Sequence, residues 1–214
     1  MAPQDGERSI IEDATQFFAE QGLDGHTRDL AKRLGVTQSL IYRYFPTKDA
    51  LIEAVYRVGM EETWNPAWEA WIADRSQPLE ARILRFYRDY ARVIMNFRWV
   101  RLFAFSGLKG LDYHLRFMRK IRAGVLDAIL AEMRFDYGLP SLEELPATEF
   151  EHETVMALQA SVFYICARRW LYNLPVPKDI DAVLTARVVG FADTAPPKIA
   201  AHLASLQSVT MAGD

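Results

Sequence analysis

The sequence has few of the features that would mark it as secreted, disulfide-stabilised or membrane-bound. Its 214 residues include one cysteine, Cys166, which excludes an intramolecular disulfide and any site built from several cysteine ligands. Arg or Lys interrupts the longest apolar runs within a few residues, so no transmembrane helix is predicted. The N-terminus is polar and shows no signal peptide. We therefore expect a cytoplasmic protein without a membrane partner.

Cys166 itself lies in an apolar run, between Val162 and Ala167. That setting predicts a buried, small side chain, with a redox-sensing thiol as the alternative. The composition, half hydrophobic and a quarter charged, is that of a soluble globular protein. The formal net charge of −3 is not that of a strongly basic, histone-like protein. Any DNA binding must therefore rest on a local basic patch.

The sequence also lacks the motifs of common enzyme classes. It contains no phosphate-binding P-loop, no dinucleotide-binding glycine fingerprint, no paired-histidine zinc motif and no nucleophile elbow. Its four histidines are scattered. Glu149, His152 and Glu153 share one predicted helix and could ligate a metal ion, but an ordinary surface group is the favoured interpretation. We predict a protein that is not an enzyme and has neither cofactor nor metal.

Helical periodicity fills almost the whole chain. No stretch alternates apolar and polar residues between hairpin turns, as a β-strand would. We therefore predict an all-α fold. A capping-box pair, Ser9 and Glu12, places the start of the first helix at Ser9. Gly22 is expected to end that helix in a left-handed conformation.

Residues 27–45 form two short predicted helices on either side of a tight turn at Gly35. Thr27 and Thr37 are the expected N-caps of the two helices. Pro46 ends the second helix because proline disfavours helical geometry in the residue before it. This arrangement is a helix-turn-helix, whose second helix enters the major groove of DNA.

A helical wheel divides the second of these helices into two faces. One face is polar or amphipathic and free to meet DNA; it carries Gln38, Ser39, Tyr42 and Arg43. The other face is apolar and packs on the preceding helices; it carries Leu40, Ile41, Tyr44 and Phe45. Between Arg28 and Lys48 the sequence has five basic residues and one acidic residue, a local net charge of +4. Such a patch suits the binding of DNA phosphates.

These features occur in an order that resembles the N-terminal domain of the TetR family of transcriptional regulators. The matching run begins with ATQFFAEQG at 14–22, continues with TRDLAKRLGVTQSLIYRYFPTK at 27–48 and ends at Leu51. The resemblance covers roughly residues 8–56, the span of one helix-turn-helix module.

The resemblance implies a division of the chain into functional parts. Residues 1–50 would be a helix-turn-helix DNA-binding domain, and residues 51–206 a helical-bundle domain for ligand binding and dimerisation. The last residues, 207–214, are small and polar, which predicts a frayed tail. In this family two late helices pair with their symmetry mates as a four-helix bundle. The expected pair here lies at about 149–173 and about 179–194.

The resemblance also assigns DNA contacts, residue by residue. The expected DNA-binding residues are Thr27, Arg28, Thr37, Gln38, Ser39, Tyr42, Arg43, Tyr44 and Lys48. Gln38, Ser39 and Arg43 would read bases in the groove, since Gln bonds adenine and Arg bonds guanine bidentately. Tyr42 and Lys48 would hold phosphates and set the register on the DNA.

The remaining positions leave more than one role open. Thr27 and Thr37 would contact phosphates or base edges. Arg28 could equally be an ordinary solvated charge. Tyr44 matches a position that touches the DNA backbone in relatives, but the wheel also places it near the core. His26 stands where relatives more often have a small or hydroxyl residue, and it either changes a backbone contact or only occupies the loop.

The C-terminal part is rich in aromatic side chains, most of which must be core. The resemblance implies an apolar cavity among them, of roughly 300–1,000 Å³, for a small, largely apolar or aromatic effector. The candidate lining residues are Trp68, Tyr90, Phe103, Tyr113, Phe117 and Phe163. A basic set could pair with an acidic ligand, although a solvated helix face is the favoured interpretation. That set is Arg116, Arg119, Lys120 and Arg122.

The predicted function is a ligand-responsive transcriptional regulator, and a repressor by the family's usual habit. It would bind a palindromic double-stranded operator as a homodimer and be released by its small-molecule effector. The alternative is an all-α protein-interaction module that never touches DNA. The acidic overall charge slightly favours that alternative. The polar helix face with Gln38, Tyr42 and Lys48 disfavours it.

Overall fold

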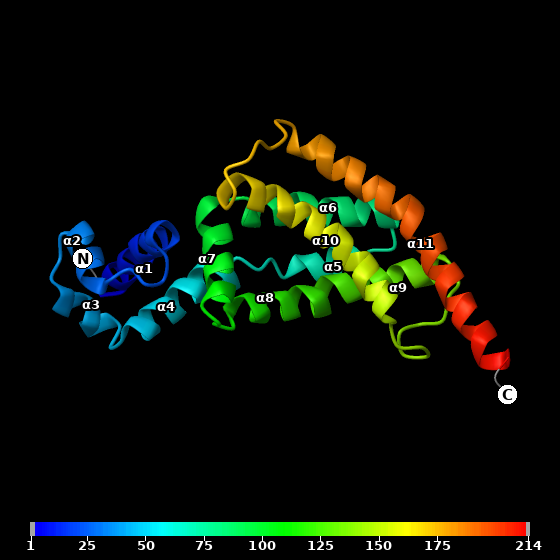
Figure 1. Cartoon of the computed structure of the whole chain (residues 1–214), viewed down its shortest axis with the longest axis horizontal. Coiled ribbons are helices and arrows are strands. Elements are labelled where there is room, and N and C mark those ends of the chain that lie inside the picture. The colour runs from blue at the N-terminus through cyan, green and yellow to red at the C-terminus, as the bar shows by residue number, and fades with distance from the viewer. Residues whose placement is uncertain (1–2, 213–214) are drawn as a thin grey trace. The chain divides into compact units, whose positions relative to one another are not determined.

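The computed structural model describes residues 3–212, and every regular element in that range is a helix (Figure 1). This confirms the all-α prediction. The helices form two compact units. The first contains the described residues up to 64, with 93–118 and 170–173; the second contains 65–92, 119–169 and the described chain from 174 onward. Neither unit ends at residue 50. The predicted division into a DNA-binding domain at 1–50 and a ligand-binding domain at 51–206 is a functional one and stays a prediction.

The first unit is built on α1 (Pro3–Gln21). Three helices pack against it: α2 (Thr27–Leu34), α4 (Lys48–Tyr56) and α7 (Phe97–Leu108). The other elements are α3 (Gln38–Tyr44), which packs on α2, the π-helix η1 (Arg57–Glu61) and most of α8 (Tyr113–Ile121). The core of this unit includes Phe18, Leu30, Ile41, Leu51 and Val55, all fully buried. Each such side chain contributes about 1.5–3 kcal/mol on burial, which holds the short helices in place.

The start of α1 differs from the prediction. The helix begins at Pro3, so Ser9 lies inside it and the spacing of Ser9 and Glu12 does not mark its start. Proline suits the first turn of a helix because the N–H that it lacks would have no intrahelical partner there. The predicted inward face of the helix is confirmed, since Ile10 and Ala14 are buried.

Four helix ends carry the residue types that such ends favour. Gly22 and Gly35 follow α1 and α2 with φ angles of 80° and 67°, a left-handed conformation in which glycine has no steric penalty. Thr37 and Thr47 cap α3 and α4. Each hydroxyl accepts a hydrogen bond from the backbone N–H three residues further on, at 3.3 Å and 3.0 Å respectively.

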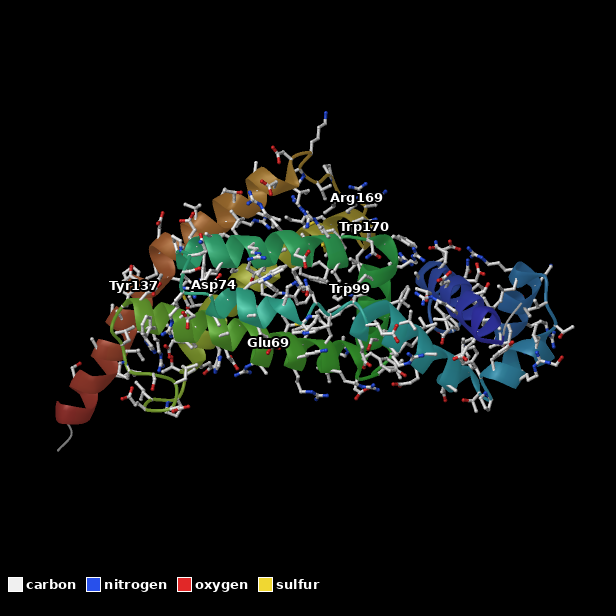
Figure 2. The ribbon with its side chains drawn as sticks, turned by 180° about the vertical axis from the view of Figure 1, so that it is seen from behind. Glu69, Asp74, Trp99, Tyr137, Arg169 and Trp170 are labelled. Atoms are coloured by element: carbon white, nitrogen blue, oxygen red, sulfur yellow. The ribbon has the colours of Figure 1, made fainter. Side chains whose placement is uncertain are left out.

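The second unit has an aromatic core. It contains all or most of α5 (Ala67–Ala73), α6 (Leu79–Ile94), the π-helix η2 (Arg122–Leu126), α9 (Asp127–Asp136), α10 (Glu149–Trp170) and α11 (Ile180–Ala212). Trp68 packs edge to face on Phe86, with ring centroids 5.4 Å apart, and Tyr90 stacks on Phe86 at 5.3 Å. Asp74, labelled in Figure 2, ends α5 and accepts hydrogen bonds from the N–H and hydroxyl of Ser76, at 3.1 and 2.6 Å.

The last helix is longer than predicted. The sequence predicts an end near residue 194, before Pro196 and Pro197, but α11 runs through both prolines to Ala212. The prolines remove helix hydrogen bonds, yet a buried stripe at four-residue spacing continues past them. That stripe consists of Ala195, Ile199 and Leu203. Its burial holds the helix together. The predicted frayed tail at 207–214 is therefore helical as far as Ala212, and the last two residues lie outside the described part of the chain.

Arg134 and Glu151 form a fully buried ion pair in the second unit. Arg134 donates to both carboxylate oxygens at 2.7 Å and, through Nη1, to three carbonyl oxygens of the loop 140–145 at 2.6–3.2 Å. Glu151 also accepts from the N–H and hydroxyl of Thr148, at 2.8 and 3.0 Å. Burial alone would raise the pKa of Glu151, but the hydrogen bonds from Arg134 and Thr148 outweigh it and lower that pKa. The pair therefore fixes the loop that leads into α10.

Cys166 is fully buried on α10, as predicted, and burial raises the pKa of its thiol to about 12. No helix within residues 3–212 combines the length and the apolar character that crossing a bilayer requires. Over the same residues, no group of three or more metal-ligating side chains comes together.

Candidate nucleic-acid interface

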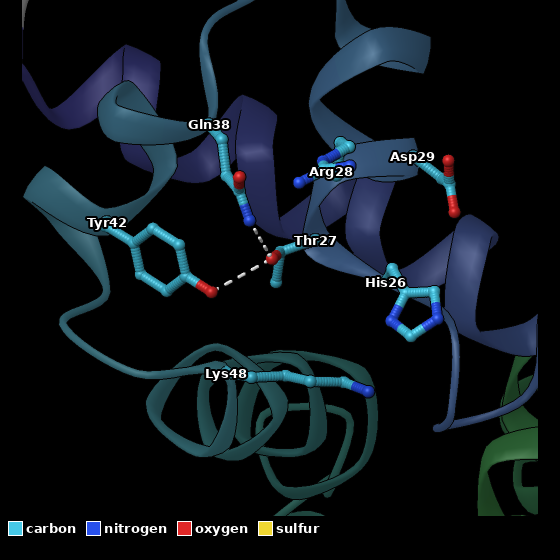
Figure 3. A pocket seen from close by; sticks show the side chains of 7 residues that line it. All are labelled: His26, Thr27, Arg28, Asp29, Gln38, Tyr42 and Lys48. Carbon is cyan, nitrogen blue, oxygen red and sulfur yellow. Dashed lines mark hydrogen bonds between the residues drawn. The ribbon is translucent and has the colours of Figure 1, made fainter.

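A hollow of about 540 Å³ lies where the starts of α2 and α4 meet α3 (Figure 3). Thr27 and Arg28 come from the first turn of α2, Gln38 and Tyr42 from α3, and Lys48 from the first position of α4. The full lining is His26, Thr27, Arg28, Asp29, Gln38, Tyr42 and Lys48. Five of these seven residues are among the DNA contacts expected from the sequence, so the fold brings most of the expected set into one place.

Thr27 is the centre of the hydrogen bonding in this hollow. It is not the N-cap of α2: His26 holds that position, and its side chain makes no capping hydrogen bond. The Thr27 side chain instead turns toward α3 and is buried, with 6% of the residue exposed. Its Oγ1 accepts a hydrogen bond from Nε2 of Gln38 at 2.8 Å and shares another with the hydroxyl of Tyr42 at 3.0 Å (Figure 3). These two bonds tie α3 to the start of α2.

The two faces of α3 are those that its sequence predicts. Ile41 and Phe45 are buried. Ser39 and Arg43 are exposed, and Tyr42 is 37% exposed. Ser39 and Arg43 are not among the residues that line the hollow. The polar face of α3 therefore has one part inside the hollow and one part beside it.

The electrostatics of the hollow suit a phosphate group. The first N–H groups of a helix carry partial positive charge, and the N-cap residue of α2, His26, makes no side-chain hydrogen bond to them. Arg28 and Lys48 add two positive charges against the single carboxylate of Asp29. The Nζ of Lys48 also lies 5.9 Å from the ring centroid of Phe18, within the range of a cation–π contact. Anions bind readily at such helix starts.

The basic patch is weaker than the sequence count suggests. Arg33 forms an ion pair with Glu20 of α1 at 2.5 Å, and both side chains are only partly exposed. Hydrogen bonds from Arg33 and Gln16 lower the pKa of Glu20, so this carboxylate stays charged. The net of +4 counted over residues 28–48 omits Glu20, because that residue lies outside the counted segment. The charge available to DNA is correspondingly smaller.

Two expected contact residues have structural roles outside the hollow. Thr37 caps α3, and its hydroxyl also shares a hydrogen bond with that of Ser39 at 3.0 Å. Tyr44 is half-buried and packs against Phe45, with ring centroids 6.5 Å apart. The placement of Tyr44 near the core agrees with the helical wheel. A DNA contact by either residue stays a prediction.

His26 and Asp29 line the hollow but were not among the expected contacts. The sequence did single out His26 as a departure from the family pattern, and its place directly before Thr27 was the available signal. Asp29 gave no signal of its own, because an acidic residue in the first turn of a helix is also explained by the helix dipole.

The six aromatic residues expected to line an effector cavity fall into two groups. Phe103, Tyr113 and Phe117 belong to the first unit, whereas Trp68, Tyr90 and Phe163 belong to the second. Tyr113 stacks on Tyr56, with ring centroids 4.0 Å apart, and Trp68 and Tyr90 are fully buried. A single cavity lined by all six stays a prediction.

Two residues of the basic set at 116–122, Arg116 and Arg122, already have partners within the protein. Arg116 contacts Glu53 at 2.9 Å and Asp112 at 3.0 Å. Arg122 bonds to Nε2 of His152 at 2.9 Å. These contacts favour the interpretation of an ordinary charged surface over that of a site for an acidic ligand.

Comparison with known proteins agrees with this geometry. Residues 10–55 match the sequence profile described as "Bacterial regulatory proteins, tetR family". The chain is 28% identical over 137 residues to the tetracycline repressor protein class A from transposon 1721 of Escherichia coli, which covers 60% of this chain and 61% of that protein. It is 32% identical over 98 residues to the class D tetracycline repressor of Escherichia coli, covering 42% and 44%. The matched region thus spans about three fifths of the first relative and less than half of the second.

Solved structures share the fold over most of the chain. AmtR of Mycobacterium smegmatis aligns with a TM-score of 0.62 and 22% identity over 97% of both chains. A tetR-family transcriptional regulator from Streptomyces coelicolor aligns with a TM-score of 0.61 and 17% identity, over 97% of this chain and 90% of that one. At these identities the likeness concerns the fold. Residues 10–55 of the chain are therefore similar to the TetR family of bacterial regulatory proteins, and the helix-turn-helix and its hollow lie within that matched segment.

Proposed function

We propose that this protein is a ligand-responsive transcriptional regulator that acts as a repressor. It binds a palindromic operator in double-stranded DNA as a homodimer and leaves the DNA when a small, largely apolar or aromatic effector binds. Two of its relatives are named as tetracycline repressors, which supports both repression and a small-molecule effector.

The observation that carries the proposal is the hollow at the start of α2. It combines a phosphate-binding environment with Gln38, a side chain that can read a base edge. Phosphate contacts fix the register of a protein on DNA, and base contacts supply sequence specificity. Both kinds of group project from α2, α3 and α4, which a common apolar core holds in fixed positions. An interaction module that never met DNA would not need this combination.

Homodimerisation supplies the second half-site. Helix-turn-helix dimers read half-sites about 34–36 Å apart, or multiples of that distance. We assign the pairing surface to α10 and α11. Large apolar side chains on these helices support the assignment, since Phe150, Tyr164 and Leu206 are 40%, 51% and 44% exposed in the single chain.

Two buried polar atoms support effector binding in the second unit. The hydroxyl oxygen of Tyr87 and Oε1 of Gln159 have no hydrogen-bond partner among the described residues. Both adjoin Tyr90, whose hydroxyl accepts from Nε2 of Gln159 at 2.6 Å and whose ring centroid lies 6.2 Å from that of Tyr87. Buried polar groups are rarely left unsatisfied. An aromatic effector with one hydrogen-bond acceptor and one donor would satisfy both atoms.

Release follows from a coupling between the two sites. The effector favours an arrangement of the dimer whose half-site spacing does not match the operator. Such couplings are typically about 1–3 kcal/mol, and operator DNA must weaken effector binding by the same factor.

DNA binding is tested by mobility shift with the upstream DNA of the protein's own gene, at several salt concentrations. We expect saturable binding that weakens as the salt concentration rises, because cations are released from the phosphates. Tyr42→Ala and Lys48→Ala should each raise the Kd at least tenfold. Lys48→Ala should also lower the slope of log K against log salt by about one.

Tyr137→Ala and Lys178→Ala serve as matched controls, because both residues are exposed and neither lines the hollow. They should bind as the wild type does. If the upstream DNA shows no specific binding and a genome-wide selection of bound sites also recovers no sequence, the proposal of DNA binding is wrong. The alternative of a protein-interaction module then takes its place.

A further inference from the structure

One hydroxyl group holds both Gln38 and Tyr42. The Oγ1 of Thr27 lies 2.8 Å from Nε2 of Gln38 and 3.0 Å from the hydroxyl of Tyr42 (Figure 3). Gln38 and Tyr42 are four residues apart on α3 and therefore lie on one face of the helix. Thr27 comes from α2 and is almost fully buried, so its own hydroxyl is poorly placed to meet a base. The Thr27 hydroxyl instead acts through its hydrogen bonds to Gln38 and Tyr42.

Counting hydrogens shows what this arrangement leaves for DNA. A glutamine amide has two N–H donors and one carbonyl acceptor. One N–H of Gln38 is bonded to Thr27. The other N–H and Oε1 remain, so the free edge of the amide presents one donor beside one acceptor.

That edge matches adenine and mismatches guanine. In the major groove adenine offers an acceptor at N7 beside a donor at N6, whereas guanine offers two acceptors, N7 and O6. Against guanine, Oε1 of Gln38 would face a second acceptor. A glutamine whose two N–H groups were both free could turn its amide and meet guanine with its donors.

We propose that Thr27 is a specificity-determining residue, which makes Gln38 select adenine over guanine by holding one of its two amide hydrogens. The inference rests on the proposed function, since it concerns the operator that the protein reads. It assigns the Thr27 hydroxyl to positioning within the protein and not to direct contact with DNA.

Phosphate binding by Tyr42 strengthens the same selection. A phosphate oxygen only accepts, so the Tyr42 hydroxyl must donate to it. The shared hydrogen bond at 3.0 Å then requires Thr27 to donate to Tyr42. Thr27 has no further hydrogen to give, so its oxygen can only accept from the amide N–H of Gln38. The order of donors runs from Gln38 through Thr27 to Tyr42 and the phosphate, and it fixes the orientation of the amide.

The test begins with binding sites selected by the full-length wild-type protein from a random-sequence DNA library. Gln38→Ala identifies the base pair that Gln38 reads, as the position at which preference disappears. At that position the wild type should prefer adenine over guanine by about tenfold or more. Thr27→Val, which keeps the shape of the side chain and removes the hydroxyl, should reduce the ratio to within about threefold while leaving preferences elsewhere unchanged. Thr27→Ser should keep it.

Thr15→Val is the matched control, because Thr15 is also buried in the first unit but donates only to the carbonyl of Ile11 in its own helix. It should not change the ratio. Should Thr27→Val fail to fold, Tyr42→Phe provides a second measurement: the Thr27 hydroxyl is then free to donate to Oε1, the amide turns, and the adenine preference should fall. An unchanged ratio in Thr27→Val, or in Tyr42→Phe if that variant is needed, overturns the inference alone. A wild-type protein that selects no sequence overturns the proposed function itself.

Discussion

The hollow at the start of α2 and the interior of the second unit each contain an arginine and a carboxylate, but the two places differ in solvent exposure. In the hollow, Arg28 and Asp29 are exposed to solvent. In the second unit, Arg134 and Glu151 are fully buried, and all three guanidinium nitrogens of Arg134 donate to oxygen atoms of the protein. Charged side chains at the surface can bind a charged partner, whereas charged side chains that are paired in the interior contribute to the stability of the fold. The contrast suggests where substitutions should affect DNA binding and where they should affect stability.

The largest effect is expected from Arg134→Met. This change leaves the Glu151 carboxylate buried without its cation and three loop carbonyl groups without their donor. Breaking a buried pair by removing one partner costs about 3–5 kcal/mol of unfolding free energy. Urea denaturation followed by circular dichroism measures it, with the exposed Arg119→Met as the control that should unfold like the wild type.

The same pair has a pH signature. The pKa of Glu151 is lower in the folded protein than its ordinary value of about 4.3. Its contribution to stability is therefore fully present above about pH 4.3 and is lost as the pH falls through the folded-state pKa. The stability difference between the wild type and Arg134→Met should shrink below that pH. A difference that stays constant down to pH 3 would show that the ion pair is not its source.

An intermediate effect is expected in the aromatic core of the second unit. A double variant, Gln159→Leu with Tyr90→Phe, removes both partners of one hydrogen bond together with the unsatisfied Oε1. Replacing both partners by apolar groups is nearly neutral, so the unfolding free energy should stay within about 1 kcal/mol of the wild type or rise. The response to effector should be lost, which amounts to about 1–3 kcal/mol of coupling.

A panel of small aromatic compounds, screened by thermal shift on the wild type, supplies the probes for that measurement. Compounds that stabilise the wild type should not stabilise the double variant, and they should no longer weaken its DNA binding. Equal shifts in both proteins would place the effector elsewhere. Leu158→Met, a buried substitution on the same helix, controls for general repacking.

The smallest effect is expected from Arg33→Gln. Arg33 is one of the five basic residues counted between Arg28 and Lys48, but Glu20 already balances its charge at the surface. Exposed ion pairs contribute little to stability, so the melting temperature should not change. The Kd for operator DNA should change less than twofold, against a larger loss for Lys32→Gln on the same helix. A tenfold loss in Arg33→Gln would mean that Arg33 leaves Glu20 to bind a phosphate.

The sequence predicts the helix ends and the helix faces around the hollow for a physical reason. Helix caps such as Thr37 and Thr47, and the left-handed glycine at Gly35, depend on neighbours within a few residues, so their effect can be recognised locally. The two faces of α3 follow from helical spacing alone. Of the five expected residues that line the hollow, helical spacing places Gln38 and Tyr42 on one face of α3, and the family resemblance supplies Thr27, Arg28 and Lys48.

Contacts between distant segments were not predictable in the same way. Thr27 carries a good capping side chain, but its hydroxyl bonds to Gln38, eleven residues away, and the N-cap residue, His26, makes no side-chain capping bond. Glu20 neutralises Arg33 from another helix. In α11, tertiary burial carried a helix through two prolines that end most helices. In each of these places, packing between elements outweighed the local preference.

The π-helix η1 bears on how this chain is aligned with others. It begins at Arg57, two residues after the family match ends, and the N–H of Glu62 bonds to the carbonyl of Arg57, a five-residue step. Such a turn holds one residue more than a regular helical turn. Deleting one residue within 57–61 would restore an uninterrupted helix, so this point can gain or lose a residue without a loop. The extra residue at η1 therefore rotates the side chains that follow it, relative to those of α4, by about 100° from where a regular helix would place them.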